Sequence, residues 1–347
     1  MAEAKIIMVT GISGSGSRDF CARYSRKGMK VKTYNTGDMV HELAQKYSQT
    51  PVSIENLLNL QPKMLSSLRD GAFEQIIDNL ETEKNEYDRI FIDTHAQFLW
   101  NQVYTNAYDW KHLNQIPTDM FISIIDKPSS IKENQMQKPH GKTQDHDLRD
   151  LLRWQNVEVN MTQGWASLYG KPMYIFSSKQ NPKIIDPLLE NEFLIYSSFP
   201  MTDASPADTR KINNFKKKLR NMRKSIDSYE TPVIDPADID VETNPELTLK
   251  ERIAIDRHTV HRDLNWDIGE ATDVVAYYPN PEIDLSKGVG DECTRAFEDG
   301  KFVYVISPRA RLSPFMFRAT RLFKDENEFF KFFKPHMKES LEKLKRK

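Results

Sequence analysis

Residues 5–18, KIIMVTGISGSGSR, join a short apolar run directly to a glycine-rich segment. A short continuous apolar run such as 5–10 is typical of a strand buried on both faces of a parallel sheet. A glycine-rich turn between a strand and a helix lets backbone N–H groups converge on phosphate oxygens, and the helix start adds favourable partial charge. The stretch therefore predicts a strand, a phosphate-binding loop and a helix.

The glycine-rich segment matches the P-loop pattern only in part. Gly11 and Gly16 have the outer spacing of that pattern, but Ser17 stands where it has lysine and Arg18 where it has serine or threonine. We expect the backbone cradle for an anion to be kept. The lysine that normally reaches the outer phosphates is missing, which leaves both phosphoryl transfer and a purely binding or scaffolding role open.

Strand-like apolar runs alternate with longer amphipathic or polar segments in both halves of the chain, which predicts α/β architecture with parallel sheets. In the first half the predicted strands are 5–10, 30–34, 89–92, 120–125 and 173–176. The predicted helices of that half are 39–47, 54–83 and 147–169. These elements suffice for one sheet covered by helices.

Turn-forming residues at 180–187 (QNPKIIDP) punctuate the chain, so we place a domain boundary near residues 181–190, between domains 1–185 and 190–347. The second half predicts strands at 193–196, 232–234, 273–278 and 302–306 and helices at 206–227, 248–262 and 286–299. A terminal helix from Glu326 carries Phe329, Phe330, Phe332 and Phe333 and is expected to pack on the sheet. The second half is thus expected to be another α/β domain.

Three segments of the first half resemble archaeal-type adenylate kinases: the glycine-rich loop, TGDMVHELA at 36–44, and Asp93-Thr94-His95 after a strand. The resemblance covers about residues 4–178 and implies a P-loop NTPase-like domain that binds ATP and Mg²⁺. It implies that Asp93 lies near the magnesium; the magnesium-binding hydroxyl comes from Ser15 or Ser17 or is absent. The residues expected at the phosphates are Gly11, Ser13, Gly14, Ser15, Gly16, Ser17, Arg18 and Asp93.

The same resemblance implies a lid segment at 127–154. Its basic residues do not clearly reproduce the spacing of the family's lid arginine pair. They are Lys138, His140, Lys142, Arg149 and Arg153.

The second half carries two acidic residues beside predicted element ends. Asp263 follows the predicted helix 248–262, and Glu292 lies within the predicted helix 286–299. Ser286, with Gly288 and Gly290 after it, places a hydroxyl and backbone amides near a helix start and the Glu292 carboxylate about two turns in. Such a corner can hold a phosphate and a reactive carboxylate together. Singly, these residues also suit structural roles as a cap, an ion-pair partner or a solvated helix residue.

About residues 192–320 resemble the nucleoside 2-deoxyribosyltransferase superfamily, in its branch of nucleoside 5′-monophosphate N-glycosidases. The shared features, in family order, are Asp263-Leu264, ATDVVA at 271–276, the Gly-x-Gly-x-Glu of 288–292, and Gly300-Lys301. The resemblance implies a flavodoxin/Rossmann-type domain in which Glu292 attacks the anomeric carbon. Asp263 would orient the substrate or protonate the departing base.

In this resemblance, Ser286 stands where transferases of free nucleosides tend to carry aspartate. A serine does not repel a phosphate, which favours a nucleoside monophosphate as substrate. Ser197 and Ser198 would donate to that phosphate, Phe199 would offer a stacking surface, and Gly288 and Gly290 would lie beside the substrate. The superfamily commonly completes its sites across a subunit interface, so the resemblance also implies a homo-oligomer. The glycosidic chemistry needs no cofactor.

The 347 residues hold 49 Lys and Arg against 50 Asp and Glu, a formal net charge of −1 without the basic excess of nucleic-acid binders. Cys21 and Cys293 are far apart and lack metal-ligand spacing, and no apolar run reaches the roughly 20 residues that span a bilayer. His258 and His261 share a helix face without a third ligand, and the basic run 210–224 is typical of a solvated helix face. We expect a cytoplasmic protein without a metal site, a membrane partner or a nucleic-acid partner.

Three functions stay open from the sequence. The favoured hypothesis is a nucleotide-binding P-loop domain joined to a domain that cleaves or transfers the N-glycosidic bond of a nucleoside 5′-monophosphate. The second is a nucleoside monophosphate kinase whose second domain only recognises substrate. The third is a non-enzymatic nucleotide sensor, which the missing P-loop lysine motivates.

Overall fold

The computed structural model describes residues 3–48, 51–138, 144, 146–191, 193–201, 204–239, 247–283, 286–309, 312 and 318–344. The chain divides into two compact units. Unit 1 consists of Met1–Pro182 and Ile239–Asp256, and unit 2 consists of Lys183–Asp238 and Arg257–Lys347. Residues 239–256 therefore belong to unit 1 although they follow the first part of unit 2 in the sequence.

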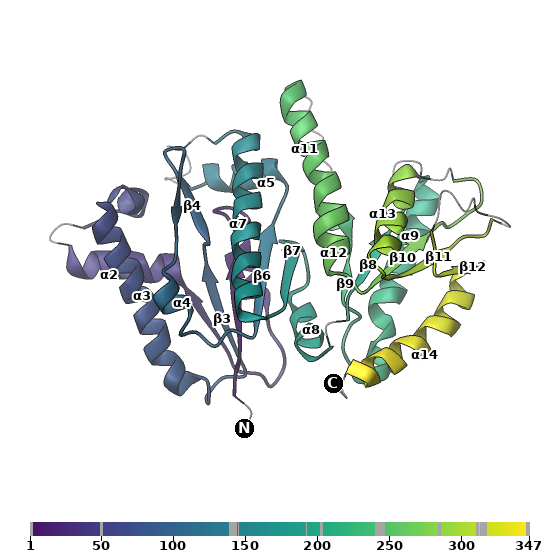
Figure 1. The fold of residues 1–347 in the computed structure, drawn as a ribbon, viewed down its shortest axis with the longest axis horizontal. Helices are drawn as coiled ribbons and strands as arrows, with labels where there is room; N and C mark the ends of the chain where they lie inside the picture. Colours follow the sequence, from purple (N-terminus) through teal and green to yellow (C-terminus); the bar gives the residue numbers. More distant parts are fainter. Residues whose placement is uncertain are drawn as a thin grey trace. The chain divides into compact units, whose positions relative to one another are not determined.

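Unit 1 is built on a five-stranded parallel sheet with the order β2-β3-β1-β6-β7 (Figure 1). Its strands are β1 (Lys5–Thr10), β2 (Val31–Asn35), β3 (Arg89–Thr94), β6 (Met120–Ile125) and β7 (Met173–Ser177). All six residues of β6 are buried, as expected of a strand covered on both faces. The loop at 11–16 begins where β1, the middle strand, ends.

The helices of unit 1 connect these strands. They are α1 (Ser17–Arg23), α2 (Thr36–Tyr47), η1 (Ile54–Asn59), α3 (Pro62–Glu83), α4 (Trp110–Leu113), α5 (Pro128–Met136) and α7 (Leu148–Tyr169). Asp147 and Asp150 form a capping box at the start of α7, and Gly170 ends the helix with a φ of 59°. A small antiparallel hairpin, β4 (Gln97–Trp100) and β5 (Val103–Asn106), follows β3.

Unit 2 holds a second five-stranded parallel sheet, with the order β12-β11-β10-β8-β9. Its strands are β8 (Ile195–Ser198), β9 (Val233–Ile234), β10 (Asp273–Tyr277), β11 (Phe302–Ile306) and β12 (Arg321–Phe323). Counted along the chain, this is the flavodoxin-like strand order. From β8 the chain first adds β9 on one side and then β10 on the other, so the order of strand addition reverses between β8 and β10. Ligands of such sheets bind at that reversal, outside the carboxyl ends of the strands.

The remaining helices lie wholly or partly in unit 2; two of them, η2 and α11, begin in unit 1 and end in unit 2. They are η2 (Pro182–Ile184), α8 (Ile185–Asn191), α9 (Pro206–Met222), α10 (Lys224–Asp227), η3 (Pro236–Asp238), α11 (Leu249–His261), the π-helix η4 (Arg262–Asp267), α12 (Ile268–Glu270), α13 (Lys287–Glu298) and α14 (Glu326–Leu344). In α14, Phe329 and Phe333 are fully buried against Tyr304 of β11 and Phe323 of β12. The phenylalanines thus pack the terminal helix on the sheet.

The predicted fold class, two parallel-sheet α/β domains, is confirmed, and several element bounds differ. The predicted helix 54–83 is interrupted before Pro62, because proline disfavours a helical residue ahead of it and lacks an N–H of its own. The hairpin β4–β5 and the short strand β12 were not predicted. With only three or four residues each, β12, β4 and β5 leave little periodicity to read.

The basic run on α9 is more than a solvated face. Lys216 is 8% exposed and its ammonium lies 2.8 Å from the Asp235 carboxylate. It also lies 4.6 Å from the centre of the Phe199 ring. One lysine of the run is therefore part of the interior, where a buried cation requires a partner.

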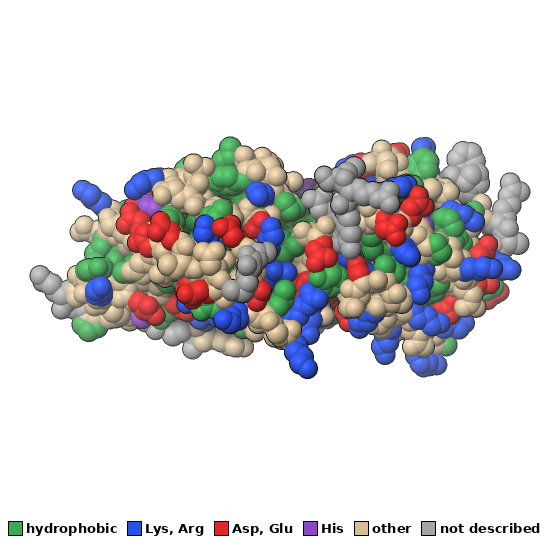
Figure 2. All heavy atoms as spheres, turned by 90° about the horizontal axis from the view of Figure 1, so that it is seen from below, with side chains coloured by type: hydrophobic (Ala, Val, Ile, Leu, Met, Phe, Trp, Pro, Cys, Tyr) green, Lys and Arg blue, Asp and Glu red, His purple; other side chains and the backbone are tan. Residues whose placement is uncertain are grey.

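The face seen in Figure 2 carries Lys and Arg side chains interspersed with Asp and Glu, in keeping with the balanced composition. Within the described ranges, none of the helices combines the length and the apolar character that crossing a membrane requires. Cys21 and Cys293 are both buried and free.

Candidate functional site

Three glycines shape the loop between β1 and α1. Gly14 and Gly16 have φ values of 88° and 91°, in the left-handed region that glycine adopts readily. A Cβ on Gly14 would lie 2.8 Å from the carbonyl oxygen of Ile131, and one on Gly11 would lie 3.0 Å from that of Ile124. Left-handed residues within a turn direct successive N–H groups to one side and form an anion-binding concavity. The loop thus has the backbone of a phosphate cradle.

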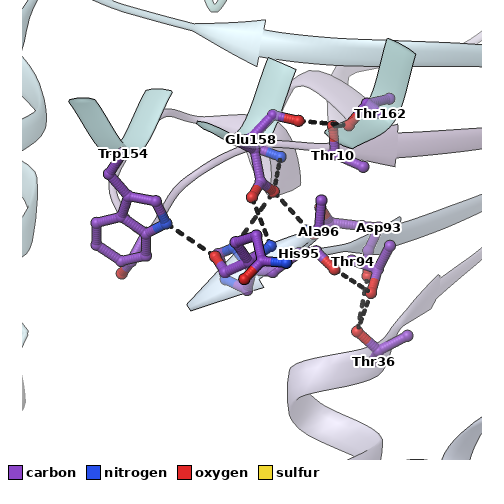
Figure 3. A network of polar contacts seen from close by, with 12 residues as sticks. Thr10, Thr36, Asp93, Thr94, His95, Ala96, Trp154, Glu158 and Thr162 are labelled. Atoms are coloured by element: carbon purple, nitrogen blue, oxygen red, sulfur yellow. Dashed lines mark hydrogen bonds and ion pairs between the residues drawn. The ribbon is translucent and has the colours of Figure 1, made fainter. Parts of the chain in front are cut away.

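A buried carboxylate on α7 holds this loop to the neighbouring strand end. Glu158, 1% exposed, accepts the N–H of Gly11 at 3.2 Å and the N–H groups of Ala96 and Gln97 at 2.8 Å each. Figure 3 shows the carboxylate directed at the segment that follows Asp93. Burial raises the pKa of Glu158 to about 8, although the three N–H groups act in the opposite direction. Glu158 therefore ties the start of the loop to the end of β3.

Two threonine pairs extend the same network. Thr10 and Thr162 share a hydrogen bond of 2.7 Å, and Thr36 donates to Thr94 at 2.9 Å (Figure 3). All four side chains are buried. The network therefore connects β1, α2, β3 and α7 around the loop.

Asp93, the last residue but one of β3, lies next to the phosphate loop. Its carboxylate accepts a hydrogen bond from the Asn35 amide at 2.6 Å, and the Ser17 hydroxyl lies close enough to lower its pKa. Burial raises the pKa of Asp93 to about 6, against the lowering effect of these two groups. A hydroxyl and a carboxylate side by side fit a Mg²⁺ ion held mainly by nucleotide phosphates, since Mg²⁺ in such sites takes only one or two protein oxygens.

The other predicted residues of the loop have different surroundings. The Ser15 hydroxyl is fully buried and has no hydrogen-bond partner within the described ranges, so it is not presented to a ligand. Ser13 contributes its carbonyl to the Gln135 amide. Arg18 pairs with Asp38 at 2.7 Å and with Asn35 at 2.9 Å. Of the two hydroxyls expected near magnesium, Ser17 is the one in contact with Asp93.

The basic residues of the predicted lid do not act as one group. Arg149 pairs with Asp147 at 2.9 Å and Arg153 with Asp150 at 3.5 Å, both on the first turns of α7. Lys138 follows α5, and charged residues of the phosphate-loop region shift its pKa. His140 and Lys142 lie outside the described residues.

In unit 2, two hydroxyls of β8 meet the predicted nucleophile on α13. Tyr196 donates to Glu292 Oε1 at 2.9 Å, and the Ser198 hydroxyl donates to Oε2. Burial raises the pKa of Glu292 to about 7; the charge of Asp263 adds to this, and the two hydroxyl bonds counteract it. The carboxylate is therefore fixed beside the carboxyl end of β8, where the strand order reverses.

The π-helix η4 adds an arginine and two aspartates. Arg262 Nε donates to Asp263 Oδ1 at 2.8 Å and lies 3.7 Å from Asp267 Oδ2. Burial raises the pKa of Asp263 and of Asp267, and Arg262 opposes both shifts. Asp263 and Glu292 each raise the pKa of Asp267 further, so three carboxylates influence one another around one guanidinium. A π-turn within a helical segment is frequent at functional sites.

The remaining predicted residues of unit 2 divide between the α13 start and the core. Ser286 is the N-cap of α13 without a side-chain capping bond, Gly288 is exposed and Gly290 is buried. The Ser197 hydroxyl donates to the Ile234 carbonyl at 3.0 Å inside the sheet, so it is not offered to a phosphate. Phe199 is 6% exposed and packs in the core against Phe215, so its ring contacts protein rather than forming an open stacking surface.

Sequence reasoning missed four residues of the two sites: Asn35, Glu158, Tyr196 as a hydroxyl donor, and Asp267. Glu158 left a signal, because Trp154, Glu158 and Thr162 recur every four residues on the buried face of α7. A carboxylate on such a face must have strong partners. Asp267 left none, since its role depends on the π-turn. No cluster of three or more metal-ligating His, Cys, Asp or Glu side chains occurs in the part of the chain that the structure describes.

Comparison with known proteins bears on unit 1. Residues 10–152 match a family model described as an AAA domain. Over these residues unit 1 is thus similar to AAA domains. No curated protein matches the sequence. Among solved structures, TT1252 from Thermus thermophilus shares 12% identity over 50% of this chain and 89% of its own, with a TM-score of 0.30, too low to argue from.

Proposed function

We propose that this protein binds a nucleotide through the P-loop of unit 1 and that unit 2 cleaves or transfers the N-glycosidic bond of a nucleoside 5′-monophosphate. The observation that carries the second part is the double hydrogen bond of Tyr196 and Ser198 to Glu292. Two donors on one strand hold both carboxylate oxygens, which fixes the side chain in one orientation. A nucleophile for a displacement at carbon requires such orientation.

In the proposed reaction a Glu292 oxygen forms a bond to C1′ of the sugar while the C1′–N bond to the base breaks. The electron pair of that bond leaves with the base, and Asp263 in its protonated form supplies the proton. Water or an acceptor base then attacks C1′, and the Glu292 carboxylate leaves. The Asp263 carboxylate takes the proton that the attacking water or acceptor base loses in this second step, as in retaining glycosidases.

The charges of the site suit this chemistry. With Asp263 protonated, the ionised Glu292 carboxylate supplies negative charge to the site, and the Asp263 carboxylate adds to it as its proton leaves. The transition state of glycosidic cleavage develops oxocarbenium character at C1′. A buried acidic cluster stabilises that state more than the neutral ground state, which is the requirement for catalysis.

The substrate class rests on Ser286. It caps the twelve-residue helix α13, and its hydroxyl makes no capping bond to the helix. A neutral hydroxyl at a helix start suits a phosphate, whereas a carboxylate there would repel it. This is why we propose a nucleoside monophosphate over a free nucleoside.

Adenylate-type phosphoryl transfer is the second candidate, favoured by the Ser17–Asp93 contact beside the glycine-rich loop. It predicts diphosphate formation that requires ATP and Mg²⁺. A nucleotide sensor without turnover is the third, favoured by the serine in place of the P-loop lysine. It predicts a ligand-induced thermal shift without product.

The test is chromatography of the full-length protein incubated with ribo- and deoxyribonucleoside monophosphates, with and without ATP and Mg²⁺. We expect free base without ATP, and a loss of roughly 10³-fold or more in Glu292→Gln, because the nucleophile is removed. Glu298→Gln, exposed on the same helix, is the matched control and should retain the wild-type rate. Free base released at the wild-type rate by Glu292→Gln would contradict the assignment, and diphosphate formed only with ATP would favour the kinase.

A further inference from the structure

The phosphate loop of unit 1 lacks a cation of its own for the outer phosphates. Ser17 stands at the position of the P-loop lysine, and its hydroxyl is uncharged. Arg18, the neighbouring cation, is held by Asp38 and Asn35. A triphosphate in the loop would bring several negative charges that these residues do not balance.

The helix α5 is fastened to this loop through its last turn. The Asn134 amide donates to the Gly14 carbonyl at 2.9 Å, and the Gln135 amide donates to the Ser13 carbonyl at 2.6 Å. The Ile131 carbonyl oxygen lies 2.8 Å from the position that a Gly14 Cβ would take, so the helix backbone also approaches the loop closely. These three contacts fix the C-terminal end of α5 beside the loop.

Lys138 follows directly from this fastened turn. Its backbone N–H donates to the Gln135 carbonyl at 2.9 Å. Lys138 therefore lies one turn beyond the clamp, by which we mean the bonds of Asn134 and Gln135 to the loop. Lys138 is exposed as a residue, and within the described ranges its ammonium makes no ion pair shorter than 4 Å. Partial burial of the side chain and the charge of Arg18 lower the pKa of Lys138, while Asp19, Asp93 and Asp38 raise it. The ammonium thus shares its surroundings with the residues of the phosphate site.

We propose that Lys138 supplies the cation that the loop lacks and binds the outer phosphates of a nucleoside triphosphate. The inference rests on the proposed nucleotide binding at the loop. A lysine ammonium carries three donors on a flexible stem, so it serves as a point charge for phosphate wherever the backbone presents it. Here the clamp by Asn134 and Gln135 presents it from α5 instead of from α1.

The test is calorimetric titration of the full-length protein with ATP, AMP and inorganic tripolyphosphate. We expect Lys138→Ala to weaken ATP and tripolyphosphate binding about tenfold or more and AMP binding far less, since one charge-assisted contact to the outer phosphates is lost. Lys138→Arg should keep most of the affinity. Lys63→Ala, an exposed lysine on α3, is the matched control and should bind as the wild type does.

A second arm separates phosphate binding from a structural role of Lys138. Ser17→Lys restores a lysine at the usual position, so Ser17→Lys with Lys138→Ala should regain affinity for ATP. Wild-type affinity in Lys138→Ala would overturn the proposal while leaving the loop as a nucleotide site. The proposal would also be overturned if Lys138→Ala weakened ATP and AMP binding to the same degree, kept the wild-type unfolding temperature, and was not rescued by Ser17→Lys. A wild-type protein that binds none of the three ligands would overturn the nucleotide site itself, and Lys138's role with it.

Discussion

The hydroxyl of Tyr196, in β8, lies 2.9 Å from Oε1 of Glu292, in α13, although 96 residues separate the two along the chain. The parallel pairing of β8 with β10 brings them together, because α13 follows β10 and returns over the sheet. The bond lowers the pKa of Glu292, which burial would otherwise leave higher. Tyr196 is therefore a positioning residue for the proposed nucleophile.

Tyr196→Phe removes this bond and leaves the ring in place. We expect the pKa of Glu292 to rise above about 7, so the acidic limb of the pH–rate profile should move to higher pH and the rate at neutral pH should fall about tenfold. A profile of kcat/KM against pH measures both. Tyr229→Phe, which removes a tyrosine–glutamate bond to Glu190 elsewhere in unit 2, is the matched control. An unchanged acidic limb in Tyr196→Phe would show that the hydroxyl does not act on Glu292.

Glu292→Gln should stabilise the protein at alkaline pH. The folded pKa of about 7 exceeds the unfolded value of 4.5, so the folded state binds the proton more tightly. The contribution of Glu292 to the free energy of unfolding is thus present below pH 4.5 and is lost as the pH rises through about 7. Glutamine removes this dependence. Denaturant unfolding at pH 5 and pH 8 should show the variant gaining on the wild type at pH 8, and a smaller gain there than at pH 5 would contradict the assignment.

Gly14→Ala should abolish nucleotide binding by unit 1. Alanine would be strained at a φ of 88°, and its Cβ would lie 2.8 Å from the Ile131 carbonyl, so either the loop or α5 must move. Titration with ATP measures the loss. Gly28→Ala is the matched control, because Gly28 has a φ of 83° with nothing within 4 Å of its Cβ position. Equal ATP affinity in the two variants would show that the loop is not the nucleotide site.

Arg262→Met should destabilise unit 2 strongly. The guanidinium lies 2.7 Å from Asp263 and 3.7 Å from Asp267, and removal of one partner of a buried ion pair typically costs about 3–5 kcal/mol. Denaturant unfolding followed in the full-length protein measures the loss. Arg257→Met, exposed five residues earlier, should change stability by less than about 0.5 kcal/mol. Similar stabilities of the two variants would show that the carboxylates do not depend on Arg262.

Local patterns in the sequence were enough for the sheets and for the position of the phosphate loop. The run KIIMVT reads as a buried strand because five of its six residues lie in the core, and the apolar run of β6 does so because all six are buried. Gly14 and Gly16 signal the loop because their backbone angles exclude most other residues. Glu292 could be proposed as a nucleophile because its spacing from two glycines and a serine is local as well.

Tertiary structure alone decided which side chains serve these sites. Glu158 reaches the N–H of Gly11 across 147 residues, and the amides of Asn134 and Gln135 hold the end of α5 at the loop. Phe199 and Ser197 looked available in the sequence, yet the packing of Phe215 and the pairing of β8 with β9 place them inside unit 2. Periodicity and spacing report on neighbours along the chain. Hydrogen-bond partners and burial depend on strand order, which no single segment encodes.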